Sequence, residues 1–443
     1  MTPAARLSAA IEILDLIDQS RGPAEGVIRA YFRARRYAGS KDRRATNERV
    51  YAVIRHRARL DWWIAGAAGD MAPISRVRVL AASLLIDREN AGSVANLFDG
   101  VGHGPALLQA TERDLVDNLA GKPLHHDAMP DGVLAEIPDW LTEPLQHEFG
   151  DGLQTEMAAL NTPASVDVRV NLGRVSRQQA RKSLQRDGIK CEDTPLSLCG
   201  LRLAEHARLD DTKAFKKGLI EIQDEGSQLI ALLCQARPGM TVIDYCAGAG
   251  GKTLALADIM GLQGNTPTAG RLIACDVSAK RLARMDHRLQ RSGARAIERM
   301  VLENGIPPRD LNAMADRVLV DAPCSGTGAW RRHPEARWRL TRQRLDEHLA
   351  DQRTVLEAAA KLVKPGGQLI YATCSLLGEE NEDQIEEFLN THGDFEILPA
   401  GQIWNQAMGI AAPPGTTRSQ GIFLSPARTG TDGFFCAILG KKV

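Results

Sequence analysis

The chain has 443 residues, of which 44% are hydrophobic and 25% charged, a composition typical of a folded protein and unlike that of a disordered or fibrous one. This length exceeds a single ordinary core, so we expect about two or three domains. The 55 basic residues balance 55 acidic ones, which excludes a protein that is basic throughout but does not exclude local basic patches.

Residues 1–125 carry apolar side chains at helical spacing, such as Leu7, Ile11 and Leu14, and no strand pattern interrupts them. They predict an all-α domain. The first 19 residues mix apolar side chains with charged ones, as an amphipathic helix does and a secretory leader does not. We see no candidate membrane span and therefore expect a cytoplasmic protein.

Two basic runs occupy residues 33–59 and 331–344. The first includes Arg43 and Arg44, and the second begins with Arg331 and Arg332. Such runs are often solvated helix faces, and they are also the usual means of contacting nucleic-acid phosphates. The second run follows a candidate active-site loop, which favours phosphate contact there.

Residues 121–132, rich in Gly, Pro and His, predict a linker between domains. After it, residues 135–216 predict a small α+β domain. Val166, Val168 and Val170 alternate with polar residues as in a half-buried strand. Ser176 is a suitable N-cap for a short basic helix that ends near residue 187.

Residues 217–443 alternate apolar strands with longer helices, the pattern of a doubly wound α/β domain with a Rossmann-like parallel sheet. We expect helices at residues 252–260 and 278–291. The expected strands are residues 241–245, 271–276, 317–321, 368–373 and 434–439.

A glycine-rich loop follows the first of these strands and opens a helix, where the backbone can approach a cofactor. Its residues are Cys246, Ala247, Gly248, Ala249, Gly250, Gly251 and Lys252. One interpretation is a phosphate-binding P-loop with Lys252 and a metal-holding Asp321, but Cys246 stands where that motif requires glycine. The favoured interpretation is S-adenosylmethionine binding, with Asp276 at the end of the second strand bonding the ribose hydroxyls. The spacing does not match a nicotinamide fingerprint.

The eight cysteines include no C-x-x-C pair, so we expect no zinc site and no other metal. Two of them, Cys324 and Cys374, follow the expected strands at residues 317–321 and 368–373 and could face one pocket. Methylation of cytosine carbon 5 requires a thiolate that first adds to carbon 6, and a second group that removes the carbon 5 proton. Cys374 and Cys324 suit these tasks, and Asp321 could bond the ring nitrogen.

Three motifs together resemble the RsmB/Nop/Sun family of RNA 5-methylcytosine methyltransferases over about residues 217–443. They are Asp-Tyr-Cys-Ala-Gly-Ala-Gly-Gly-Lys-Thr at 244–253, Asp-Ala-Pro-Cys-Ser-Gly-Thr-Gly at 321–328 and Ala-Thr-Cys-Ser at 372–375. The resemblance implies that Cys374 is the nucleophile and that Cys324 is the second cysteine, needed for product release. It also implies that residues 246–252, Asp276 and Asp321 contact the cofactor.

The basic helices resemble the NusB-like RNA-binding domain of bacterial ribosomal-RNA members, and residues 135–216 resemble their RRM-like domain. The resemblance implies a 16S ribosomal RNA substrate, with tRNA as an alternative. From the two basic runs we expect RNA contacts by Arg43, Arg44, Arg331 and Arg332. We expect a monomer. Two functions of different classes also fit parts of the sequence: an NTP-dependent RNA remodelling enzyme and a noncatalytic RNA-binding scaffold.

The chain departs from the family at two places. Leu302 lies where members carry an acid near the cofactor adenine, and Glu303 or Asn304 could replace that acid. Ala249 stands where many members have proline, a change that the loop should tolerate.

Overall fold

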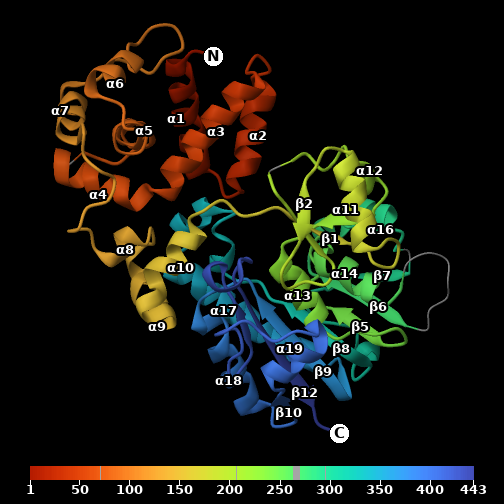
Figure 1. Cartoon of the computed structure of the whole chain (residues 1–443). Coiled ribbons are helices and arrows are strands. Elements are labelled where there is room, and N and C mark those ends of the chain that lie inside the picture. The colour runs from red at the N-terminus through yellow and green to blue at the C-terminus, as the bar shows by residue number, and fades with distance from the viewer. Residues whose placement is uncertain (70, 206, 263–269, 295) are drawn as a thin grey trace. The chain divides into compact units, whose positions relative to one another are not determined.

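The computed structural model describes residues 1–69, 71–205, 207–262, 270–294 and 296–443 and divides into two compact units (Figure 1). Unit 1 contains Met1–Thr162 and Trp330–Leu340, and unit 2 contains Pro163–Ala329 and Thr341–Val443. The chain therefore passes from one unit to the other after Thr162, after Ala329 and again after Leu340.

Unit 1 is helical, as the sequence predicts. The first helix begins where Thr2 accepts a hydrogen bond from Ala5 N at 3.1 Å, and it buries Ala9, Ile13 and Ile17, which share one face. The helices of this unit are α1 (Pro3–Gln19), α2 (Ala24–Ala34), α3 (Ser40–Arg55), α4 (Arg57–Ala68), α5 (Ser75–Leu85), α6 (Ala91–Leu97), α7 (Ala110–Leu119), α8 (Asp131–Leu134), α9 (Thr142–Phe149) and α10 (Leu153–Leu160), with the short 3₁₀ helices η1 (Asp139–Leu141), η2 (Gly150–Gly152) and η5 (Pro334–Trp338).

The stretch expected to be a linker, residues 121–132, packs against these helices. Trp63 Nε1 donates to the carbonyl oxygen of Leu124 at 3.1 Å, and Met129 is buried in the same core. By compactness alone, the helical unit runs to Thr162.

Unit 2 begins with a four-stranded antiparallel sheet in the order β2-β3-β1-β4. Its elements are β1 (Asp167–Val170), α11 (Arg177–Arg186), β2 (Cys191–Asp193), β3 (Gly200–Leu203), α12 (Lys213–Lys216) and β4 (Ile220–Ile222). The predicted cap of α11 is present, since Ser176 accepts from Gln179 N at 3.2 Å. Because β4 pairs with β1, the sheet extends past the expected domain end at residue 216.

The larger sheet of unit 2 has the order β10-β12-β9-β8-β5-β6-β7, with β11 paired to β12. Its strands are β5 (Thr241–Asp244), β6 (Arg271–Asp276), β7 (Ile297–Val301), β8 (Ala315–Asp321), β9 (Val363–Thr373), β10 (Phe395–Ile397), β11 (Ile422–Leu424) and β12 (Phe434–Lys441). Strands β7, β6, β5, β8 and β9 are parallel, whereas β12 runs antiparallel to β9. The carboxyl ends of the parallel strands therefore share one edge, and the order reverses at β5, as expected for a doubly wound site.

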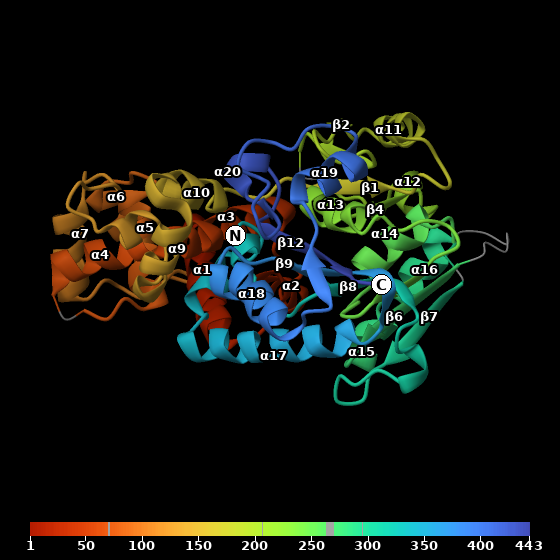
Figure 2. The same ribbon diagram turned by 90° about the horizontal axis from the view of Figure 1, so that it is seen from below.

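Helices cover both faces of this sheet, with α17 on one side and α13 and α19 on the other (Figure 2). The helical elements are α13 (Glu225–Leu233), α14 (Gly251–Ile259), α15 (Ala279–Ala283), α16 (Asp286–Ser292), η3 (Arg309–Leu311), η4 (Thr327–Ala329), α17 (Arg342–Ala360), η6 (Gly378–Glu380), α18 (Glu382–Thr391), α19 (Ala400–Met408) and α20 (Pro426–Thr429). The helix expected at residues 278–291 is split into α15 and α16, and Met285 between them packs in the core.

None of the helices among the described residues combines the length and the apolar character needed to cross a membrane.

Candidate active site

The glycine-rich loop joins β5 to α14 at the point where the strand order reverses. Gly248 and Gly250 have φ values of 55° and 82°, a backbone conformation that favours glycine. A Cβ atom at Gly250 would lie 2.4 Å from Met285 Cγ, whereas one at Gly248 would meet only the carbonyl oxygen of Cys246, at 4.0 Å. The loop is therefore packed on its Gly250 side and open at Gly248, where a ligand can approach the backbone.

The small sheet holds this loop from the other side. Gln223, just after β4, donates through Nε2 to the carbonyl oxygen of Gly251 at 3.3 Å. Glu221 pairs with Arg288 at 3.0 Å, and Arg288 donates to the carbonyl oxygen of Ala249 at 2.6 Å. The antiparallel domain thus helps to fix the glycine loop, a role that was not visible in the sequence.

Asp276 ends β6 beside the loop and is almost fully buried. Its Oδ2 accepts from Gly248 N at 2.9 Å, while Oδ1 accepts from Ser278 N at 2.7 Å and pairs with Arg281 at 2.7 Å. The structure thus brings the predicted acid to the open part of the loop.

The segment after β7 contains the departure from the family pattern. Leu302 is buried, and its amide donates to the carbonyl oxygen of Asp276 at 3.0 Å. Glu303 and Asn304 are exposed, and Asn304 turns the chain with a φ of 52°. Beyond this turn, Gly305 accepts a hydrogen bond from Tyr245 OH, which anchors the segment to the start of the glycine loop.

The two predicted cysteines meet. Cys324 follows β8 and Cys374 follows β9, and their Sγ atoms lie 3.4 Å apart. The loops are tied together because Gly328 N donates to the carbonyl oxygen of Cys374 at 2.9 Å. The two thiols therefore lie at the ends of adjacent strands, as expected, and close enough to contact each other.

Asp321 and Lys252 form an ion pair of 2.7 Å next to these thiols. Lys252 is nearly buried, whereas about a third of the Asp321 side chain is exposed. Burial lowers the pKa of Lys252, but attraction to Asp321, Cys374 and Asp244 outweighs it, so the pKa is raised and the ammonium is retained. The sequence placed both residues in the site without indicating that they bind each other.

Glu380 is a site residue that the sequence analysis missed. It is fully buried in η6 and accepts hydrogen bonds from Ser325 N at 2.8 Å and from Gln352 Nε2 at 3.0 Å. The only sequence signal is a carboxylate that stands six residues after Cys374, which is too general to single out.

The residues expected to contact RNA lie in unit 1 and differ in exposure. Arg44 is 82% exposed and pairs with Glu48, whereas Arg43 donates to the carbonyl oxygen of Ala38 at 2.9 Å. Arg331 is 6% exposed and Arg332 is half-buried. The burial of Arg331 argues against the expected phosphate contact there.

The burial has a physical reason, because residues 330–340 pack among the helices of unit 1. Arg339 donates to the carbonyl oxygens of Ile17 and Gly22 at 2.6 and 2.8 Å. Trp338 Nε1 donates to that of Ile54 at 3.0 Å, and Arg337, fully buried, donates to that of Glu136 at 2.8 Å. This part of the second basic run therefore stabilises the helical unit.

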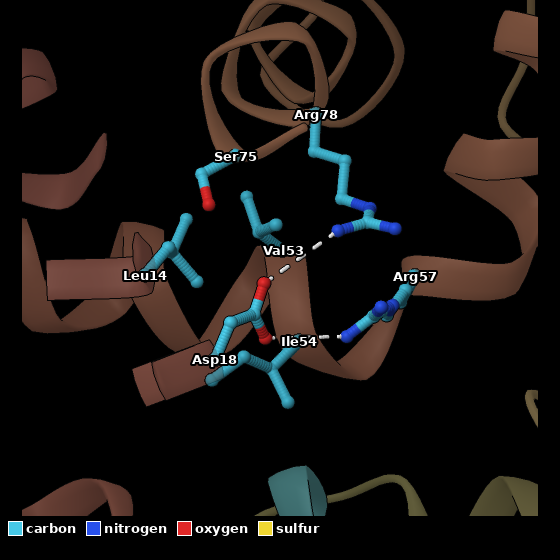
Figure 3. A pocket seen from close by; sticks show the side chains of 7 residues that line it. All are labelled: Leu14, Asp18, Val53, Ile54, Arg57, Ser75 and Arg78. Atoms are coloured by element: carbon cyan, nitrogen blue, oxygen red, sulfur yellow. Dashed lines mark hydrogen bonds and ion pairs between the residues drawn. The ribbon is translucent and has the colours of Figure 1, made fainter. Parts of the chain in front are cut away.

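A small pocket in unit 1 is lined by Leu14, Asp18, Val53, Ile54, Arg57, Ser75 and Arg78 (Figure 3). Asp18 lies between Arg57, at 3.4 Å, and Arg78, at 3.9 Å, and Arg78 also binds Asp61 at 2.7 Å. These carboxylates neutralise both guanidinium groups, so we regard the cluster as structural. Within the residues that the structure describes, no three side chains of His, Cys, Asp or Glu converge as a metal site.

Comparison with known proteins gives the family. The model described as 16S rRNA methyltransferase RsmB/F matches residues 231–440, and the ferredoxin-like domain of the same proteins matches residues 137–210. "Probable ribosomal RNA small subunit methyltransferase B" of Synechocystis sp. (strain PCC 6803) is 31% identical over 423 residues, which cover 90% of this chain and 91% of that protein. "Ribosomal RNA small subunit methyltransferase B" of Pseudomonas syringae pv. tomato is 35% identical over 76% of this chain and 71% of its own length.

Solved structures agree with this result. The protein of "Crystal Structure of PH0851" superimposes with a TM-score of 0.76 and 26% identity, over 100% of this chain and 99% of that one. A "Methyltransferase Homolog Protein from Pyrococcus Horikoshii" superimposes with a TM-score of 0.59 and 28% identity, over 72% and 100% of the two chains. The C-terminal Rossmann-like domain and the ferredoxin-like domain are therefore those of this group. The chain belongs to the RsmB/F family and is an S-adenosylmethionine-dependent RNA methyltransferase.

Proposed function

We propose that this enzyme methylates carbon 5 of a cytosine in 16S ribosomal RNA through a covalent adduct on Cys374. The observation that carries the proposal is the pair of thiols, 3.4 Å apart at the ends of two adjacent strands. One thiol can form a bond to the cytosine ring, and the other can help to break that bond. The relatives named as small-subunit ribosomal RNA methyltransferases support the choice of RNA.

The residues at the glycine loop fit S-adenosylmethionine. The open backbone at Gly248 and the carboxylate of Asp276 would hold its amino-acid and ribose parts, as in other doubly wound sites. The exposed apolar side chains of Val277, next to Asp276, and Ile306, after the turn that follows β7, offer a surface for the adenine. Contact with this surface would not require an acid at Leu302. When bound, the cofactor supplies an electrophilic methyl group.

In the proposed reaction, the Cys374 thiolate adds to carbon 6 of the cytosine, and the electron pair displaced to carbon 5 takes up the methyl group. Lys252 stabilises the thiolate before attack through its charge, and Asp321 holds the proton on the ring nitrogen. The carbon 5 proton then leaves, the bond between carbon 6 and Cys374 breaks, and Cys324 acts in this elimination, either as the base or beside it.

We further propose that unit 1 is a NusB-like domain that holds RNA flanking the target, with Arg44 as a phosphate contact. Its side chain projects from α3, and structured RNA is recognised mainly through phosphates and shape. The protein would act in the cytoplasm as a monomer.

The test is incubation with RNA that contains 5-fluorocytosine, followed by a denaturing gel. We expect a protein–RNA adduct with the native chain, because fluorine at carbon 5 blocks the elimination step that would release the RNA. We expect none with Cys374→Ala, because that variant lacks the thiol that forms the adduct. Cys191→Ala, a half-buried thiol in β2 outside the site, is the matched control and should form the adduct normally. An adduct that survives in Cys374→Ala would contradict the assignment.

A further inference from the structure

The Glu380 carboxylate lies against the loop that carries Cys324. Its Oε1 accepts from Ser325 N at 2.8 Å, and its Oε2 accepts from Ser325 Oγ at 2.5 Å. Gln352 Nε2, in α17, donates both to Glu380 Oε1 at 3.0 Å and to the carbonyl oxygen of Pro323 at 2.9 Å. The backbone on both sides of Cys324 is therefore fixed by one buried pair of side chains.

Glu380 is itself held in place. It is fully buried, and its backbone oxygen accepts from Tyr371 OH at 2.6 Å, within the strand that leads to Cys374. The neighbouring Asn381 accepts from Thr373 Oγ1 at 2.5 Å and donates to the carbonyl oxygen of Ser375 at 3.1 Å. The same turn thus fixes the loops of both cysteines.

The groups bonded to the Glu380 carboxylate all act as donors: a backbone amide, a hydroxyl and a carboxamide. This is the arrangement that an ionised carboxylate requires, because it can only accept hydrogen bonds. These donors are neutral, so no cation bonded to Glu380 among the described residues cancels the negative charge that acts on Cys324.

The two thiols therefore have unlike surroundings. A hydrogen bond to Cys374, burial, and the charges of Cys374 and Glu380 raise the pKa of Cys324 well above its usual range. Cys374 instead lies within the field of the Lys252 ammonium, which Asp321 holds from its other side. The charges around Cys324 therefore favour its thiol form, whereas Cys374 faces the cation of Lys252.

We propose that Glu380 is a positioning residue that keeps Cys324 protonated and fixed in its loop, so that Cys374 alone serves as the nucleophile. The effect of Glu380 on turnover rests on the proposed covalent mechanism. The difference in reactivity between Cys324 and Cys374 does not depend on that mechanism. Cys324 then reaches elimination with its proton in place: its S–H gives that proton to the sulfur of Cys374 as that sulfur leaves the ring, and the Cys324 thiolate formed in this way takes up the proton from carbon 5.

The experiment is alkylation of the full-length protein by limiting iodoacetamide over a range of pH, with each cysteine quantified by peptide mass spectrometry. In the native chain, Cys374 should react at least about tenfold faster than Cys324 near neutral pH, since the thiolate is the reactive form. Glu380→Gln, which has nearly the same shape, should move the reaction of Cys324 to lower pH and raise its rate about tenfold at fixed pH. The alkylation rate of Cys324, with Glu380 and with Glu380→Gln, is also measured in a Cys374→Ser background, so that modification of Cys374 does not block Cys324.

Glu379→Gln is the matched control, because Glu379 lies next in sequence but pairs at the surface with Arg342. Glu379→Gln should leave the alkylation rates of Cys324 and Cys374 unchanged over the whole range of pH. If the pH profile of Cys324 alkylation is unchanged in folded Glu380→Gln, the proposal is overturned. Faster alkylation of Cys324 than of Cys374 in the native chain also overturns it, and this second measurement requires no variant. Glu380→Gln should also lower kcat about tenfold with little change in KM for RNA. Since alkylation uses no RNA, its outcome is independent of the 5-fluorocytosine result.

Discussion

Cys324 Sγ and Cys374 Sγ lie 3.4 Å apart, although fifty positions of sequence separate the two residues. Parallel pairing of β8 with β9 sets this distance, because Asp321 lies opposite Ala372 and each cysteine follows a few residues later. The pair can therefore act on one base, one thiol in attack and the other in release.

The first prediction concerns release. Cys324→Ala should trap the methylated RNA, because Cys374 can still add to the base but elimination lacks its partner. We expect a stable complex with ordinary RNA on a denaturing gel and multiple turnover reduced by about 10² or more. Normal turnover by Cys324→Ala, without a trapped complex, would remove this residue from the mechanism.

The second prediction concerns Lys252. Replacing it by Met removes the charge that faces Cys374 and leaves Asp321 without its 2.7 Å partner, so methyl transfer should fall by about 10- to 100-fold. Single-turnover rates with saturating RNA and cofactor measure this step. Lys364→Met is the control, since Lys364 pairs with Asp316 at the opposite end of β8 and should matter little. Equal effects of the two substitutions would argue against a role in the site.

The third prediction is a dependence of stability on pH. Burial raises the pKa of Asp244 from 3.8 to about 7, although Thr253 donates a hydrogen bond to it. Between these values the unfolded chain releases the proton while the folded chain keeps it, so the free energy of unfolding falls as pH rises toward 7 and is then constant. The total loss is on the order of a few kcal/mol.

Asp244→Asn removes this term, so the native chain should lose stability relative to the variant as the pH rises from 3.8 to about 7. Urea unfolding of both proteins at each pH measures the difference. A difference that stays constant across the range would show that Asp244 does not titrate there.

The fourth prediction separates two neighbouring arginines. Arg44→Ala should weaken RNA binding severalfold and reduce the slope of log affinity against log salt by about one, as loss of one phosphate contact does. Arg43→Ala should instead lower the melting temperature of the protein, because Arg43 binds the carbonyl oxygen of Ala38 and lies over the Phe32 ring. Identical salt slopes for Arg44→Ala and the native chain would exclude the contact.

Features that depend on local pattern could be predicted from the sequence. The strand ending at Asp276 has the predicted bounds, and the predicted helix cap at Ser176 is present. The glycine-rich loop expected after the first strand of the α/β domain is present, and Gly248 and Gly250 in it have positive φ. Each of these features is fixed within a few residues by alternation, capping or conformational freedom.

Features that depend on contacts distant in sequence could not be predicted. Nothing near Lys252 indicates that its partner is Asp321, and nothing near Glu380 indicates that it binds Ser325. Arg331 belongs to a run that looks like an exposed basic face, but its segment packs with helices that come some three hundred positions earlier. Composition cannot distinguish an arginine that faces solvent from one that binds helix-end carbonyls.

The return of residues 330–340 to unit 1 limits how this enzyme can be divided. Glu335 accepts from Ala24 N at 2.8 Å at the start of α2, and Arg339 binds the end of α1. A fragment that ends at Thr162 would lose both contacts, and a fragment that begins at Pro163 would carry Arg337, fully buried in the intact chain, without the carbonyl oxygen of Glu136 that it binds. The catalytic domain is thus not a portable module, and any chimera with another RNA-binding domain must also replace this segment.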